Sequence, residues 1–178
     1  MAAREPAMSD NPILPQRKRH RLPVDSYILT DNAYFFTVCA RHQGKPFRNP
    51  DLARTVVDSL IWTRNKYQWK LYCYCLMPDH MHFVCRPTVS GGFINAGSRG
   101  FLPESTLDHL ARFKSFTTSA SWKHGFSGPL WQRSSFDVIL DETRPFEVVA
   151  GYVLENPVRK QLVADWTMWP FSGIVDEW

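Results

Sequence analysis

The sequence lacks any uninterrupted run of about 18 apolar residues, which is the length that a membrane-spanning helix needs. It also lacks an evident secretory signal, because Glu5 and Asp10 precede any apolar stretch. Cysteine is scarce, and all four cysteines lie in apolar, strand-like segments: Cys39, Cys73, Cys75 and Cys85. Buried, reduced thiols are typical of the cytoplasm, whereas disulfide frameworks are typical of secreted proteins. We therefore expect a cytoplasmic protein without a membrane segment.

The chain has 178 residues, enough for one domain with a substantial hydrophobic core. Its apolar content of 44% and aromatic content of 14% are those of a globular protein. We expect a mobile basic arm (1–20), a main domain (21–165) and an aromatic tail (166–178) that docks on the domain. The net charge of +4 is compatible with a nucleic-acid partner.

Residue patterns predict an α+β fold with an antiparallel sheet. β-branched and aromatic residues gather in four predicted strands: 34–40, 69–75, 80–86 and 130–140. Apolar residues recur at helical spacing in three predicted helices: 51–67, one capped by Ser105, and one from about Thr143 to Asn156. The order strand, helix, strand, strand, helix, strand is the split β-α-β pattern of a ferredoxin-like fold, with helices on one face. The last helix, which carries Tyr152, is an addition to that pattern.

The stretch Leu76–Arg86 carries the strongest functional pattern. Pro78 and Asp79 predict a turn, so His80 and His82 open the strand that follows. Alternate side chains of a strand share a face, which places the two imidazoles roughly 6–7 Å apart along it. Such a pair can hold one divalent metal and leave positions open for a substrate oxygen. The pattern also fits two half-exposed strand histidines, since such pairs occur by chance.

Three other polar features can each be interpreted as structural or as functional. Tyr152 and Asn156 are four residues apart on one helix flank, which by itself fits an aromatic ring at the core edge and an asparagine that ends the helix before Pro157. The glycine-rich loop 90–100 either connects elements or cradles phosphates. A basic cluster at the junction of the arm and the main domain is either solvated or contacts phosphates: Arg17, Lys18, Arg19 and Arg21.

Several motifs, in the same order along the chain, resemble one protein family. Met77–Phe83 is similar to the His-hydrophobic-His motif of the HUH single-strand tyrosine transposases. Leu130–Arg133, Tyr152–Arg159 and Trp169–Ser172 resemble motifs of one branch, the REP-associated tyrosine transposases. The resemblance spans about residues 20–173 and agrees with the predicted fold.

The resemblance implies that Tyr152 is the nucleophile, that His80 and His82 bind Mg²⁺ or Mn²⁺, and that Asn156 stands where relatives place a third ligand. The implied substrate is single-stranded DNA folded into a hairpin, a repetitive extragenic palindrome, cut through a 5′-phosphotyrosine intermediate. The resemblance favours a nucleoid-associated monomer, although relatives in other branches are dimers that exchange the tyrosine helix. Position 138 is Val, where many members have His.

Further DNA contacts are suggested by charge and by position in the chain. Arg112, Lys114 and Arg133 are candidates for phosphate contacts, and Trp131 is a candidate for stacking on a base.

Two other functions fit the same residues. One is a catalytically silent regulator that binds DNA hairpins. The other is a structural zinc protein that uses Cys73, Cys75, His80 and His82, although their spacing is not a usual zinc-finger pattern.

Overall fold

The computed structural model describes residues 27, 32–41, 44–87, 93–95, 101–103 and 105–178. The predicted basic arm and the basic cluster Arg17, Lys18, Arg19 and Arg21 lie outside the described residues, as does most of the glycine-rich loop 90–100. Within these ranges, no helix has the length and apolar character that crossing a membrane requires.

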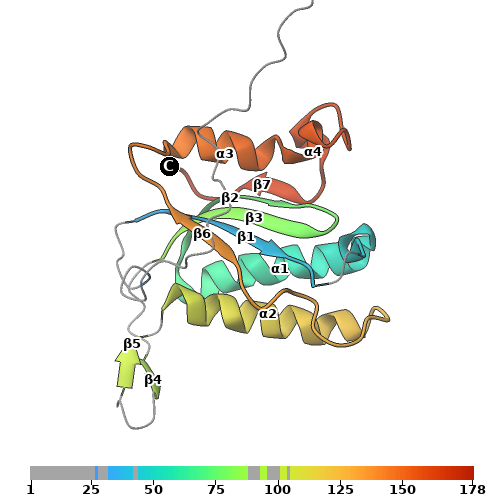
Figure 1. Ribbon diagram of the computed structural model, residues 1–178, viewed down its shortest axis with the longest axis horizontal. Coiled ribbons are helices and arrows are strands. Elements are labelled where there is room, and N and C mark those ends of the chain that lie inside the picture. The colour runs from blue at the N-terminus through green and yellow to red at the C-terminus, as the bar shows by residue number, and fades with distance from the viewer. Residues whose placement is uncertain (1–26, 28–31, 42–43, 88–92, 96–100, 104) are drawn as a thin grey trace, which may run out of the picture.

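A five-stranded antiparallel sheet forms the centre of the molecule, with the strand order β6-β1-β3-β2-β7 (Figure 1). Its strands are β1 (Tyr34–Cys39), β2 (Lys70–Leu76), β3 (His80–Arg86), β6 (Phe136–Ile139) and β7 (Ser172–Ile174). A separate two-stranded antiparallel sheet pairs β4 (Phe93–Asn95) with β5 (Phe101–Pro103). The predicted α+β fold is thus confirmed, and β3 lies in the middle of the sheet, paired on both sides.

Side-chain caps fix the starts of two helices, α1 (Pro50–Tyr67) and α2 (Thr106–Trp122). Asn49 accepts hydrogen bonds from the backbone of Asp51 and Leu52 at 3.0 and 3.1 Å, and Ser105 forms a capping box with Asp108. The other α-helices are α3 (Phe146–Leu154) and α4 (Asn156–Arg159). Two short 3₁₀ helices are η2 (Pro46–Arg48) and η4 (Trp166–Met168).

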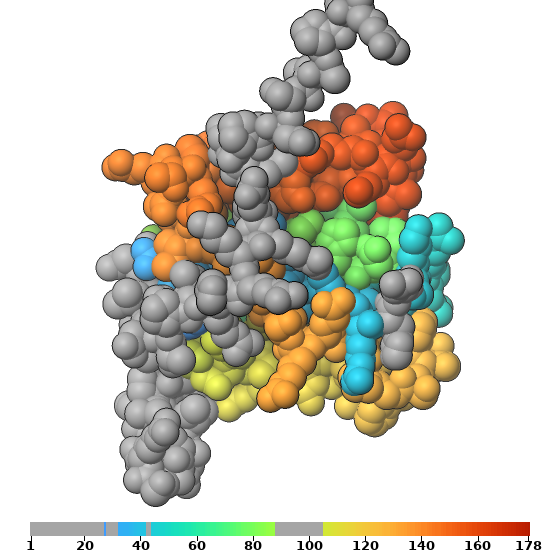
Figure 2. Space-filling model, in the orientation of Figure 1, coloured from blue at the N-terminus to red at the C-terminus, as the bar shows by residue number. Residues whose placement is uncertain are grey.

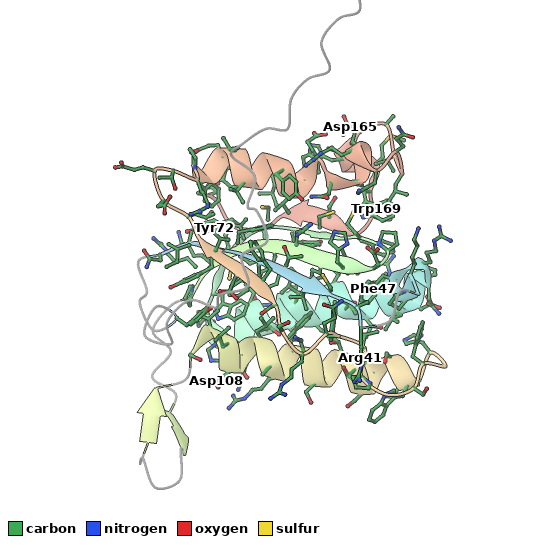
Figure 3. All side chains as sticks on the ribbon, in the orientation of Figure 1. Arg41, Phe47, Tyr72, Asp108, Asp165 and Trp169 are labelled. Atoms are coloured by element: carbon green, nitrogen blue, oxygen red, sulfur yellow. The ribbon has the colours of Figure 1, made fainter. Side chains whose placement is uncertain are left out.

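Helices cover both faces of the sheet, because side chains of β1 and β3 alternate between two hydrophobic clusters. Helices α1 and α2 lie on one face, where Met81 and Phe83 are buried, and α3 lies on the other face, beside Val84 (Figure 1). Figure 3 labels a residue of each layer, Phe47 on the α1 side and Tyr72 on the α3 side. The histidines of β3 therefore belong to the layer that α3 covers.

The C-terminal segment adds β7, a strand that the sequence patterns did not predict. It pairs antiparallel with β2, and the indole of Trp169 donates a hydrogen bond to the carbonyl of Leu76 at 2.9 Å. Figure 1 shows β7 beside β2 at the edge of the sheet, and Figure 2 shows the orange-red C-terminal part of the chain above the green strands. Three residues are too few for a period of two to be recognised, which explains why the strand was missed.

Asp176 anchors the end of the chain. Its carboxylate accepts hydrogen bonds from Arg64, with Nε at 3.0 Å, and from the backbone N–H of Leu71 at 2.8 Å. The hydrogen bond from Arg64 holds the pKa of this carboxyl below its usual range.

We expect Asp176→Ala to lower the free energy of unfolding by about 1–3 kcal/mol, because it removes charge-assisted bonds from a partly buried site. The measurement is urea denaturation. The matched control is Glu177→Ala, which changes an exposed neighbour. Equal stability of the two variants would contradict the anchoring role of Asp176.

Candidate active site

His80 and His82 lie on the same face of β3, as predicted, and their rings turn toward each other. The two Nε2 atoms are 3.1 Å apart, and the ring planes meet at 75°. Each ring uses its other nitrogen for a second partner. Nδ1 of His80 contacts Oδ1 of Asp79 at 2.6 Å, and Nδ1 of His82 contacts Oγ1 of Thr37 at 2.9 Å. These partners fix the ring orientations and leave both Nε2 atoms facing one point.

His82 is buried, and its environment favours the neutral imidazole. Burial lowers its pKa to about 3, with further contributions from His80 and from the positive charge of Arg159. The ring packs on Phe35 with centroids 5.3 Å apart. A neutral imidazole keeps the lone pair that a metal ion requires.

This low pKa predicts a pH dependence of stability in the metal-free protein. The unfolded state takes up a proton on this side chain near pH 6.5 and the folded state does so only near pH 3. Stability is therefore full above about pH 6.5 and falls as the pH drops, by up to about 1.4 kcal/mol per pH unit from this group. Urea denaturation from pH 7 to pH 5 in a chelator, compared with His82→Gln, checks this. The same pH dependence in both proteins would contradict it.

Tyr152 lies on α3 beside this pair. Its half-buried ring meets His82 edge-on at a centroid distance of 5.6 Å and Phe35 at 6.1 Å. The guanidinium carbon of Arg159 lies 4.7 Å from its ring centroid. Among the described residues, no hydrogen bond involves the Tyr152 hydroxyl. The hydroxyl is therefore available to a substrate.

Apolar contacts hold α3, and so Tyr152, at this position. Val149, Ala150 and Val153 are buried against the sheet, and Phe146 stacks edge-on against Tyr72 at 4.8 Å. Helical spacing puts Tyr152 at the margin of this apolar stripe, where one side of the ring is packed and the rest faces outward.

Asn156 begins α4, one turn after Tyr152, and is 4% exposed. Its Nδ2 donates to the carbonyl of Tyr152 at 2.8 Å. Within the described part of the chain, its Oδ1 accepts no hydrogen bond. A buried acceptor without a partner is costly, and a cation is one partner that would satisfy it.

The donor set fits an octahedral divalent ion. In octahedral coordination, two neighbouring ligand atoms that each lie about 2.1 Å from the ion are about 3.0 Å from each other. This distance is close to the 3.1 Å between the Nε2 atoms of His80 and His82. The described residues contain no group of three or more His, Cys, Asp and Glu that could hold a metal. A site with few protein ligands suits Mg²⁺, which usually keeps waters and binds substrate phosphate oxygens.

The structure gives no support to the structural zinc site. Cys73 and Cys75 are buried in the core, where burial raises the pKa of each thiol to about 12 in the metal-free protein. With His80 and His82 they form no metal-binding group among the described residues.

Two of the predicted DNA contacts lie on the face of the sheet opposite the histidine pair. Arg112 and Lys114 belong to α2, on the opposite face of the sheet (Figure 1). Arg112 donates to the Tyr67 hydroxyl at 3.0 Å, and Lys114 donates to the carbonyl of Arg133 at 3.1 Å. Their contacts with phosphates stay predictions.

Trp131 requires a correction. It is 3% exposed and packs on Phe47 and Phe113, and its indole N–H donates to Thr117 at 2.7 Å. The ring is part of the core and offers no open face for stacking on a DNA base.

Sequence reasoning missed Thr37 and Arg159 as residues of the site. Thr37 reaches His82 because the two are directly opposite in the β1–β3 register, which the sequence does not reveal. Arg159 lies in a motif that the sequence analysis singled out, but its position over the Tyr152 ring depends on the turn from α3 into α4.

Two comparisons with known proteins agree with the family resemblance. The chain is 21% identical over 150 residues to the REP-associated tyrosine transposase of Escherichia coli strain K12. The aligned region covers 82% of this chain and 78% of that protein. The solved structure of a REP-associated tyrosine transposase bound to a REP hairpin matches with a TM-score of 0.60 and 20% identity, covering 89% of this chain and 82% of that one. No family model matches the sequence. The resemblance to REP-associated tyrosine transposases is confirmed, and so is the fold.

Proposed function

We propose that this protein is a metal-dependent endonuclease and strand transferase that binds single-stranded DNA hairpins and cuts them with Tyr152. One observation carries the proposal: the Tyr152 ring lies 5.6 Å from that of His82, whose Nε2 is 3.1 Å from that of His80. A nucleophile beside a two-nitrogen cation site is an arrangement suited to phosphodiester cleavage.

In the proposed reaction, the Tyr152 oxygen attacks the phosphorus of the scissile linkage. A bond forms between that oxygen and phosphorus, and the bond from phosphorus to the 3′ oxygen breaks. The phenol proton passes to water, and the departing 3′ oxygen takes up a proton. The products are a 5′-phosphotyrosine and a free 3′-hydroxyl, so the bond energy is kept and a 3′-hydroxyl can reverse the step to join strands.

His80, His82 and Asn156 are the residues that would hold Mg²⁺ or Mn²⁺. When bound, such an ion supplies Lewis-acid polarisation and orientation of the phosphate. Asp79 and Thr37 keep the two imidazoles turned toward one point, and burial keeps His82 neutral. A tyrosine hydroxyl is mostly protonated at neutral pH, with a reference pKa of about 10, so it needs positive charge nearby to react.

The proposed substrate is a DNA hairpin of the repetitive extragenic palindrome type, because the matching solved structure is bound to a REP hairpin. The net charge of +4 suits such a partner. Action as a monomer is supported by the position of Tyr152, which lies beside His82 of its own chain.

The test uses single-stranded hairpin oligonucleotides copied from repeated palindromes of the host chromosome. They are labelled at the 3′ end, because the intermediate retains the fragment on the 3′ side of the cut. We expect a labelled protein band on a denaturing gel with Mg²⁺ or Mn²⁺ and none in EDTA. Hairpin binding without any covalent product would instead identify the catalytically silent regulator.

A further inference from the structure

Arg159 is the positive charge nearest to the proposed nucleophile among the described contacts. It lies at the end of α4, which sits over the end of the sheet where β2 turns into β3 (Figure 1). Its guanidinium carbon is 4.7 Å from the ring centroid of Tyr152. Its charge also contributes to the low pKa of His82, which places it within electrostatic reach of the histidine pair.

The guanidinium has no acidic partner in the described part of the chain. The ion pairs there involve Arg64, His80 and Arg144, and no described hydrogen bond uses the Arg159 side chain. The side chain is exposed, so its donors are open to a ligand. An arginine that stacks on an aromatic ring and keeps its donors open is suited to bind a phosphate through two parallel hydrogen bonds.

We propose that Arg159 is a catalytic residue that binds the scissile phosphate through its non-bridging oxygens while its guanidinium lies over the Tyr152 ring. One side chain would then hold the phosphate and the phenol together. It would also offset the negative charge that grows on the phosphate oxygens as the bond to Tyr152 forms. This inference rests on the proposed cleavage function.

A purely structural role would be to support the Tyr152 ring. Arg159→Met separates the two roles, because methionine keeps an unbranched apolar stem that can cover the ring and removes the charge. Arg159→Lys keeps the charge and loses the paired donors. Lys160→Met is the matched control, since it removes an exposed neighbouring charge that has no contact with Tyr152 among the described residues.

The first measurement is the single-turnover rate of covalent product formation with a hairpin oligonucleotide that the wild type cleaves. We expect Arg159→Met to slow the step on the order of 10²-fold. Arg159→Lys should recover part of the rate, and Lys160→Met should stay near the wild type. A rate for Arg159→Met equal to that of the wild type overturns the inference.

The second measurement is hairpin binding in a Tyr152→Phe background, where no cleavage interferes. The same oligonucleotide is compared with one that carries a neutral methylphosphonate at the mapped cleavage position. We expect Arg159→Met to weaken binding of the ordinary hairpin about tenfold or more and to leave binding of the methylphosphonate hairpin unchanged. Equal weakening for both hairpins overturns the inference, because the guanidinium would then act elsewhere.

The experiments distinguish a failure of the proposed cleavage function from a failure of the proposed role of Arg159. If the wild type forms no covalent product with any hairpin, the cleavage function fails and the role of Arg159 fails with it. If the wild type forms the product and Arg159→Met does so equally fast, only the role of Arg159 fails.

Discussion

Tyr152→Phe is expected to reduce the covalent protein–DNA product by at least about three orders of magnitude while hairpin binding persists. The substitution removes only the hydroxyl. The ring remains, and with it the contacts to Phe35, His82 and Arg159. No described hydrogen bond involves that hydroxyl, so folding should be unchanged. The measurement pairs a denaturing gel for the product with a binding assay for the hairpin.

Tyr74→Phe is the matched control for this experiment. Tyr74 is half-buried on the sheet face that α1 and α2 cover, away from the histidine pair. We expect product formation at the wild-type rate. A product that survives in Tyr152→Phe would move the nucleophile to another residue and remove the chemical role of α3.

His80→Ala and His82→Ala are each expected to lower the affinity for Mn²⁺ at least about 10²-fold. Loss of an outer partner alone typically costs 10- to 100-fold, and these variants remove a ligand itself. Product formation should fall in parallel at a fixed Mn²⁺ concentration. Mn²⁺ binding can be followed by electron paramagnetic resonance, because the free ion gives a sharp signal that is lost on binding.

His124→Ala is the control for metal binding, since this histidine follows α2 and is not part of the candidate site. Unchanged Mn²⁺ affinity in both β3 variants would show that the histidine pair does not hold the ion. Cys73→Ser and Cys75→Ser should leave the metal content unchanged, because among the described residues these thiols form no metal-binding group with the two histidines.

Local patterns predicted those features that depend on a short stretch of chain. The period of two on β3 placed His80 and His82 on one face and Met81 and Phe83 on the other, as the structure has them. The capping box at Ser105 marked the start of α2. Such features need no knowledge of which strands pair, so the sequence alone is sufficient for them.

Features that depend on distant pairing could not be predicted in this way. Thr37 reaches His82 only through the register of β1 with β3. Trp131 is buried because its ring packs on Phe47 and Phe113, which come from distant parts of the chain. The position of Tyr152 beside His82 depends on α3 covering the face opposite α1 and α2.

The most direct test of the proposed site is to identify the residue that becomes linked to DNA. The covalent product is digested with a protease and a nuclease, and the modified peptide is sequenced by mass spectrometry. We predict a nucleotide attached through a 5′ phosphate to the oxygen of Tyr152. A nucleotide attached to Tyr74, or to any side chain outside the cluster of Tyr152 with His80 and His82, would contradict the account.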